Sequence, residues 1–197
     1  MQKFLFGKNN DFMNYFTYAY SLKVKSFKKF VIEKDHIINS KAYDSAKTSF
    51  DYVSIISKKK YKNMVNVETV CSFENFGAPL IVLAENKIND NGKIFYGKHF
   101  EIVVYEEGLN VWEILPTENE LDPYKVNLLA SKKFIVNKNE KINLKVTIHG
   151  DALHVKVGYN ELDMKSNFPL EMYIGVTACE GINKFYSLEI DEEQIKD

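Results

Sequence analysis

The residues best suited to chemistry lie in two short stretches near the middle of the chain. His99, Glu101 and Tyr105 are interspersed with apolar residues in the first stretch, and Trp112 and Glu113 stand side by side in the second. Side chains of a β-strand point alternately to opposite faces, so His99, Glu101 and Tyr105 share one face if Phe, Ile and Val between them point into a core. A ring that stacks on C–H groups, with a carboxylate and an imidazole that hydrogen-bond to hydroxyls, could bind a sugar or another polyol.

Glu101 could also be catalytic, with a second carboxylate beside it. Glu85, which follows a continuous apolar run, is the first candidate, and Glu113 is the other. Two carboxyl groups, one acting as the acid and the other ionised, are the minimum apparatus for cleaving a glycosidic bond. Trp112 and Glu113 are neighbours, so only one of them can share the face of Glu101. Sequence spacing alone does not decide whether any of these carboxylates meet.

Other arrangements that carry chemistry are missing. No cluster of the Glu-x-Asp-x-x-Glu kind lies in an apolar strand, and the sequence has no nucleophile motif and no Gly-rich phosphate loop. Cys71 and Cys179 are too few for a disulfide framework and lack metal-ligand spacing. No spacing suggests a zinc site among the four histidines, which are His36, His99, His149 and His154. We therefore expect no metal centre and no cofactor for catalysis.

The composition narrows the range of partners. The formal charge is −1, from 26 basic and 27 acidic residues, so no strong field attracts nucleic acid or an anionic membrane. Every basic residue is Lys, and the absence of Arg disfavours sites that clamp a phosphate or carboxylate with a guanidinium. No signal-peptide core and no membrane-spanning stretch is present, so we expect a cytoplasmic protein.

The elements that must position these residues are strands. Residues 142–148 alternate between apolar and polar side chains, a turn follows, and residues 153–157 repeat the alternation, which predicts a hairpin. Residues 80–84 form a continuous apolar run typical of a central strand covered on both faces. Further strands are predicted over residues 66–73, 100–105, 110–115, 134–136, 158–162, 173–178 and 185–190.

These patterns predict an all-β protein with about ten to thirteen strands in a two-sheet antiparallel sandwich or jelly roll. Helix is confined to two short candidates, residues 10–20 and 191–196. We expect a single domain over residues 1–197, with an N-terminal segment (1–29) packing on the sandwich, a sandwich core (30–190) and an acidic tail (191–197).

Several of these segments, in this order, resemble the concanavalin A-like lectin and glucanase superfamily, in particular its compact bacterial members related to the 3-keto-disaccharide hydrolase group. The resemblance covers about residues 27–190. It rests on a strand pair over 30–38, on strands over 61–68 and 77–84, and most specifically on the closing segments 142–150, 153–157, 175–178 and 185–190. The last strand is then expected to pair back near the first.

The resemblance implies a curved sheet face that binds carbohydrate through Glu85, His99, Glu101, Tyr105, Trp112 and Glu113. The alternative is a glycoside hydrolase or lyase in which Glu101 acts with Glu85 or Glu113. A third hypothesis is a plain interaction module without a sugar, in which the protein's own side chains fill the curved face. Relatives of this fold also hold a structural Ca²⁺, for which Asp191 is the candidate ligand here.

Overall fold

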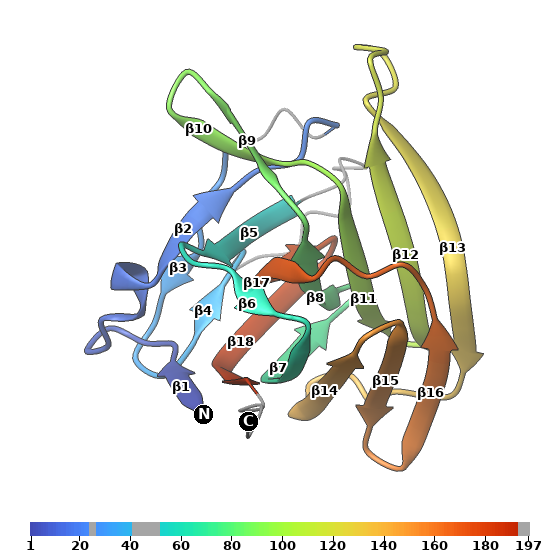
Figure 1. Ribbon diagram of the computed structural model, residues 1–197. Coiled ribbons are helices and arrows are strands. Elements are labelled where there is room, and N and C mark those ends of the chain that lie inside the picture. The colour runs from blue at the N-terminus through green and yellow to red at the C-terminus, as the bar shows by residue number, and fades with distance from the viewer. Residues whose placement is uncertain (24–26, 41–51, 193–197) are drawn as a thin grey trace.

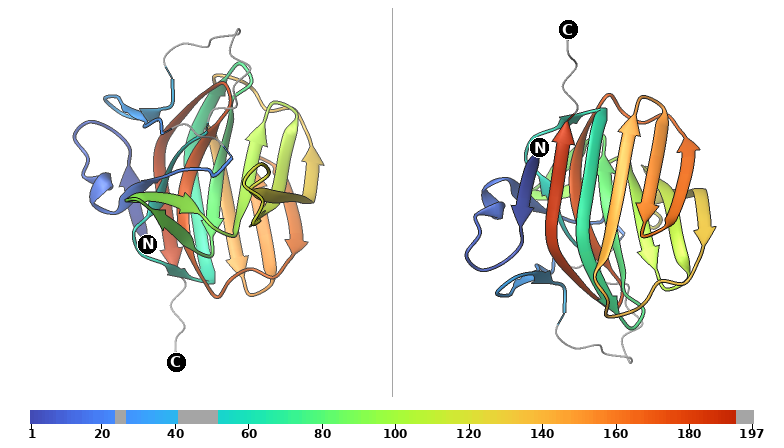
Figure 2. Two further views of the ribbon diagram at one scale, coloured as in Figure 1. Left: turned by 90° about the horizontal axis from the view of Figure 1, so that it is seen from above. Right: turned by 90° about the horizontal axis from the view of Figure 1, so that it is seen from below.

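The computed structural model describes residues 1–23, 27–40 and 52–192, and these residues form two facing antiparallel sheets (Figures 1 and 2). We call them the back sheet and the groove sheet. The back sheet contains, in spatial order, β16 (Asn160–Lys165), β15 (Ala152–Val157), β14 (Ile142–His149), β7 (Met64–Glu74), β18 (Ile182–Glu192), β4 (Ile37–Ile38) and β3 (Val31–Ile32). β1 (Gln2–Leu5) also pairs with β18, so the last strand does pair with the first.

The groove sheet has β8 and β11 near its middle. Its order is β13 (Tyr124–Lys133), β12 (Gly108–Pro116), β11 (His99–Tyr105), β8 (Ala78–Ala84), β17 (Glu171–Cys179), β5 (Tyr52–Ser57) and β2 (Phe16–Ala19), and β6 (Tyr61–Lys62) pairs with β17. A separate hairpin consists of β9 (Lys87–Asp90) and β10 (Lys93–Tyr96). The described residues contain one short 3-10 helix, η1 (Phe12–Asn14).

The main core fills the space between the sheets. Alternation along each strand supplies it, as Leu144 and Val146 do from β14 and Phe100 and Ile102 do from β11. β8 is buried along its whole length because its two faces meet different neighbours. Ile81 and Leu83 lie in the main core, whereas Leu80, Val82 and Ala84 pack on the opposite side of the groove sheet.

The outer face of the groove sheet carries a second, smaller apolar cluster. It contains Ile56, Leu80, Val82 and Tyr96, and the β9–β10 hairpin lies across it (Figure 2). Asn91 and Gly92, both at positive φ, form the tight turn of this hairpin. The hairpin therefore covers the half of the outer face formed by β5 and β2, whereas the half formed by β11, β12 and β13 lines a cavity.

The N-terminal segment joins both sheets as β1 and β2 and supplies four Phe side chains to the main core. At its end, the backbone of Tyr20 exchanges hydrogen bonds with the β9–β10 hairpin, at 2.9 Å to the Ile94 carbonyl and 3.2 Å from the Tyr96 amide. No helix among the described residues is long and apolar enough to cross a membrane.

Most predicted strands are confirmed, but the structure differs in several places, and it also contains β1, β9 and β10, which were not predicted. The helix expected over residues 10–20 is wrong, because η1 occupies only Phe12–Asn14 and Phe16–Ala19 is strand β2. Residues 134–136 are not a strand, although Phe134 and Val136 still donate backbone hydrogen bonds to Glu107 and Glu106. The sequence patterns missed β13, the edge strand beside the open part of the groove sheet. The helical candidate at 191–196 falls largely outside the described residues.

Candidate functional site

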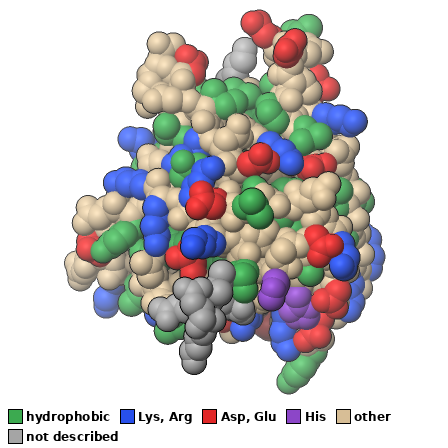
Figure 3. All heavy atoms as spheres, in the orientation of Figure 1, with side chains coloured by type: hydrophobic (Ala, Val, Ile, Leu, Met, Phe, Trp, Pro, Cys, Tyr) green, Lys and Arg blue, Asp and Glu red, His purple; other side chains and the backbone are tan. Residues whose placement is uncertain are grey.

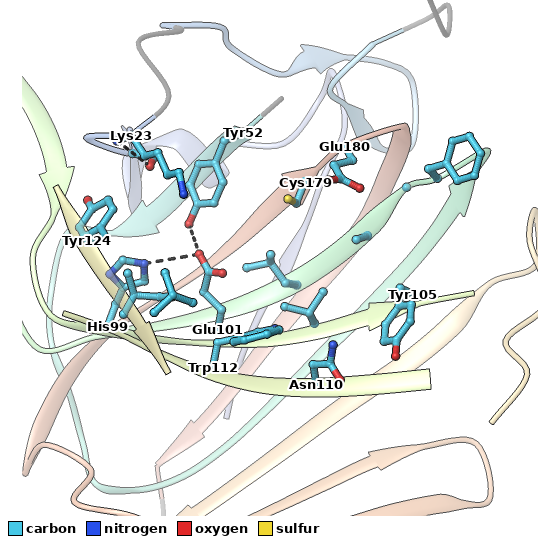
Figure 4. Close-up of a pocket in the computed structure, with 18 of the residues that line it drawn as sticks. Lys23, Tyr52, His99, Glu101, Tyr105, Asn110, Trp112, Tyr124, Cys179 and Glu180 are labelled. Atoms are coloured by element: carbon cyan, nitrogen blue, oxygen red, sulfur yellow. Dashed lines mark hydrogen bonds and ion pairs between the residues drawn. The ribbon is translucent and has the colours of Figure 1, made fainter. Parts of the chain in front are cut away.

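A cavity of about 640 Å³ lies on the open half of the groove sheet. Its floor is the outer face of β8, β11 and β12, and its walls come from β13, from the start of β5 and from the loops that precede β8 and follow β17 (Figure 4). Apolar side chains dominate the floor, among them Leu80, Val103, Trp112 and Ile114. An apolar cavity with a few convergent polar groups is the usual form of a small-molecule site.

Glu101 is the polar centre of this cavity. The hydroxyl of Tyr52 donates to its Oε1 at 2.7 Å, and Nε2 of His99 lies 3.4 Å from the same oxygen. The other carboxylate oxygen, Oε2, makes no hydrogen bond within the described part of the chain. Only 15% of the Glu101 side chain is exposed, and Glu101 lines the cavity, so Oε2 is the acceptor that remains for a ligand. Burial, and next the charge of Glu101, raise the pKa of Tyr52 well above its usual value, so Tyr52 stays a donor.

His99 is fixed on three sides. Its Nδ1 lies 2.7 Å from the carbonyl oxygen of Gly97, and its ring lies between Tyr96 and Tyr124, with ring centroids 4.9 and 5.7 Å away. The Tyr124 hydroxyl donates to the Tyr96 carbonyl at 2.8 Å and accepts from the Leu22 amide at 3.2 Å. Burial raises the pKa of Tyr124 to about 12, so this phenol keeps its proton. These contacts form one end wall of the cavity.

A β-bulge shapes the side wall. The pairing of β12 with β13 shifts between Val111 and Trp112, which leaves Leu129 as the extra residue. Trp112 then pairs with Leu128, on the groove side, while Leu129 and Ala130 both pack against the main core. Glu101 and Trp112 are direct partners across β11 and β12, so the indole and the carboxylate lie side by side on the floor.

The far end of the cavity lies between two tight loops. Phe76, which is 66% exposed, comes from the loop before β8, and Glu180 comes from the loop after β17. The loops pack glycine on glycine, since a Cβ atom on Gly181 would lie 2.2 Å from the backbone nitrogen of Gly77. Tyr105 lines the same end (Figure 4).

The structure brings together four of the six residues predicted for this face, namely His99, Glu101, Tyr105 and Trp112. It does not bring in Glu85 or Glu113. Glu85 lies outside the cavity and forms an ion pair with Lys98 at 3.1 Å. Glu113 is the direct partner of Phe100, so it points to the opposite side of the sheet, where it accepts from Asn127 at 3.1 Å. Because side chains alternate along β12, Trp112 and Glu113 point to opposite faces of the sheet, and Trp112 is the one that lies on the same face as Glu101.

Sequence reasoning missed Tyr52, Tyr124 and Glu180. Tyr124 begins β13, whose exposed and bulged pattern hides it from a search for alternation. Tyr52 begins the fully buried strand β5 and reaches Glu101 from across the sheet, so only the strand order reveals it. The only sequence signal for β13 was the Pro-containing segment before it, because Pro is typical of turns and a turn allows a further strand to follow.

Metal-binding side chains do not gather in the part of the chain that the structure describes. The described residues contain no group of three or more His, Cys, Asp or Glu that could hold a metal ion. Asp191, the residue considered for calcium, faces the amino group of Met1 at 2.6 Å.

On the face seen in Figure 3, lysines and acidic side chains are interspersed rather than gathered into one basic patch.

Neither a protein-family model nor a curated protein matches the chain. Solved structures do match. The carbohydrate-binding module CBM66 from Bacillus subtilis superposes with a TM-score of 0.63 at 12% identity, over 90% of this chain and 95% of that one. A LamA variant from Z. galactanivorans in complex with laminaritriose and laminaritetraose gives a TM-score of 0.63 at 10% identity, over 96% and 97% of the two chains. The VIP36 exoplasmic/lumenal domain in its Ca²⁺/Man3GlcNAc-bound form gives 0.62 at 8% identity, over 99% and 90%.

The chain has the concanavalin A-like sandwich fold. The resemblance found in the sequence is thus confirmed for the fold, whereas the narrower likeness to 3-keto-disaccharide hydrolases is not among these findings. A fold of this kind does not by itself define an activity.

Proposed function

We propose that this protein binds a saccharide, or a related polyol, in the cavity over β11 and β12. The observation that carries the proposal is the pairing of Glu101 with Trp112. Oε2 of Glu101 makes no hydrogen bond to any described residue, and it lies beside an indole in an apolar cavity. A sugar supplies a hydroxyl donor and an apolar C–H face on the same molecule, so it matches both groups.

The solved structures support this proposal by analogy. They include a carbohydrate-binding module, the VIP36 domain with bound Man3GlcNAc, and a LamA variant in complex with laminaritriose and laminaritetraose. All of them share the fold, which commonly uses one sheet face for such ligands. The half-open outer face also argues against an interaction module whose curved face is filled by its own side chains.

The alternative of glycoside cleavage lacks the carboxylate pair that was predicted for it. Glu85 and Glu113 lie outside the cavity. Three other glutamates line it. Glu106 and Glu107 form ion pairs with Lys138 at 2.7 Å and with Lys133 at 3.0 Å, and Glu180 comes from the loop after β17, at the far end of the cavity. We therefore propose binding rather than cleavage.

Titration with neutral oligosaccharides, followed by NMR or calorimetry, tests the proposal. We expect Trp112→Ala to weaken binding by about tenfold or more, because it removes the stacking surface. Glu113→Gln is the matched control, since it changes the next residue of the same strand but faces away from the cavity. If no saccharide binds the native protein at millimolar concentration, or if both variants bind as the native protein does, the proposal is wrong.

A further inference from the structure

The floor of the cavity extends well beyond Glu101 and Trp112. His99 and Tyr105 are the first and last residues of β11, and both line the cavity. Six steps of ~3.3 Å along the strand place their backbones about 20 Å apart. Glu101 and its partner Trp112 occupy the part of this floor nearer to His99. A single sugar ring stacked on Trp112 therefore leaves the part toward Tyr105 uncovered.

Asn110 is the polar side chain of that remaining part. It lies two residues before Trp112 on β12, so alternation puts both side chains on the cavity side of the sheet. Its cross-strand partner on β11 is Val103. Figure 4 shows Asn110 between Trp112 and Tyr105 along the floor. The floor thus carries two polar groups in succession, Glu101 and Asn110, each beside a large apolar side chain.

The amide of Asn110 has no structural partner. It is partly buried, and it forms no hydrogen bond with any residue that the structure describes. Asn127 on the neighbouring strand β13, by contrast, donates to Glu113 at 3.1 Å on the opposite face of the sheet. An amide offers two N–H donors and a carbonyl acceptor, and a hydroxyl group likewise both donates and accepts. Asn110 can therefore form two hydrogen bonds with adjacent hydroxyls of one sugar ring.

Asn110 is too far from Glu101 for one hydroxyl to reach both. Glu101 is paired with Trp112 and Asn110 with Val103, so Glu101 and Asn110 are diagonal neighbours across β11 and β12. Such neighbours lie about 7–8 Å apart. A ligand that contacts both side chains must therefore extend along the strands, from Glu101 toward Tyr105.

Tyr105 supplies an aromatic surface at that end. Its cross-strand partner is Gly108, which has to be glycine because an added Cβ would lie 2.1 Å from the Lys132 carbonyl oxygen. No side chain of β12 covers the Tyr105 ring from that position. Lys133 of β13 reaches over it instead, with Nζ 5.4 Å from the ring centroid, and a cation over an aromatic ring stabilises its orientation. Tyr105 is thus a second aromatic residue of the cavity, after Trp112.

We infer that Asn110 is a second saccharide-binding residue, and that the cavity accepts at least two linked sugar rings. The first ring lies on Trp112 beside Glu101, and the second lies over Val103, between Asn110 and Tyr105. Asn110 then determines specificity, because it selects a second ring with two adjacent free hydroxyls. This inference rests on the proposed function, and it names the class of ligand as a disaccharide or a longer chain.

Titration with matched saccharides tests the second ring. The probes are glucose, galactose and mannose, each paired with disaccharides of the same sugar in different linkages, and NMR or calorimetry measures the affinity. We expect the preferred disaccharide to bind about tenfold more tightly than its monosaccharide, as two added hydrogen bonds of typical strength would give. If a monosaccharide binds and no disaccharide of that sugar binds more tightly, the inference is wrong while the proposed function stands. If no saccharide binds, both fail.

Substitution of Asn110 tests its role directly. Asn110→Ala should remove the advantage of the disaccharide, whereas Trp112→Ala should weaken the binding of both probes. Asn143→Ala is the matched control, since it makes the same change at an exposed position of β14 in the back sheet. In the native protein, the side-chain ¹⁵N–¹H signals of Asn110 should shift more with the disaccharide than with the monosaccharide. An Asn110→Ala variant that keeps the advantage of the disaccharide, or amide signals that do not shift, would overturn the inference.

Discussion

Tyr52 on β5 donates a hydrogen bond to Glu101 on β11 although two strands, β8 and β17, lie between them in the groove sheet. Neighbouring strands are ~4.8 Å apart, so three intervals separate the two backbones by about 14 Å along a flat sheet. Glu101 is also in register with Ile56, four residues along β5 from Tyr52, so a contact of 2.7 Å between the side-chain tips requires the groove sheet to curve and twist toward its outer face. The same curvature makes the outer face a cavity rather than a flat surface.

Removal of the Tyr52 hydroxyl should destabilise the protein. Tyr52→Phe keeps the ring in its buried place but takes a donor from Glu101, and hydrogen bonds to charged groups contribute about 1.5–3 kcal/mol. Urea unfolding followed by fluorescence measures the change. Tyr159→Phe is the control, because Tyr159 is fully exposed and its loss should change the free energy of unfolding by less than ~0.5 kcal/mol. Equal effects of the two substitutions would contradict the prediction.

Gly181→Ala should disturb the far end of the cavity. Gly181 has φ of +35° and its added Cβ would collide with the backbone of Gly77. Gly158→Ala is the matched control, since Gly158 has φ of +58° but nothing within 4 Å of an added Cβ. The control should cost about 1–2 kcal/mol from left-handed strain alone, and Gly181→Ala should cost clearly more. Thermal or urea unfolding of both variants measures the difference, and a smaller loss for Gly181→Ala would show that the loops separate freely.

The two cysteines should differ in reactivity. Burial raises the pKa of the Cys71 thiol to about 12, so almost no thiolate forms at pH 8, whereas Cys179 lines the cavity. A thiol reagent such as DTNB should modify Cys179 first in the native protein, and both thiols only after unfolding. Cys179→Ser should abolish the native reaction, and a bound saccharide should slow it. Fast labelling of Cys71 in the folded protein would show that the core opens.

Stability should fall at alkaline pH. Burial raises the pKa of Tyr61 and Tyr124 to about 12, and those of Tyr52 and Tyr96 are raised too. The folded state binds these protons more tightly than the unfolded state, so their contribution is complete below about pH 10 and is lost as pH rises from 10 toward 12. Absorbance at 295 nm together with the melting temperature measures this. All 12 tyrosines ionising by pH 11 without a drop in melting temperature would contradict the prediction.

Local patterns predicted much of the fold. The β14–β15 hairpin and the doubly buried β8 follow from alternation and from a continuous apolar run, which are properties of single segments. On β11, the same alternation correctly placed His99, Glu101 and Tyr105 on one face. Two predicted site residues failed because they depend on longer-range geometry. Glu85 lies past the end of β8 and forms an ion pair with Lys98. Glu113 points away from the groove because Trp112, the residue before it on the strand, points into it.

The rest of the site depends on contacts between distant segments. The contact between Tyr52 and Glu101 depends on the order β11-β8-β17-β5 in the groove sheet. The sequence of neither segment predicts that order. Tyr124 was hidden because β13 combines an exposed edge with a bulge at Leu129, which breaks the two-residue period. His99 is likewise held by the carbonyl of Gly97, a backbone group that no side-chain pattern reveals.

The end wall built by Tyr124, Leu22 and Tyr96 has a consequence for what part of a polymer could be recognised. The hydrogen bonds from Leu22 and to Tyr96 tie β13 to the N-terminal segment and to the β9–β10 hairpin, and they close the cavity just beyond His99. A saccharide that reaches Glu101 along the cavity would stop there with its last ring. The proposed site would then recognise the terminal residue of a glycan chain, whereas a channel open at both ends would bind residues in the interior of the chain.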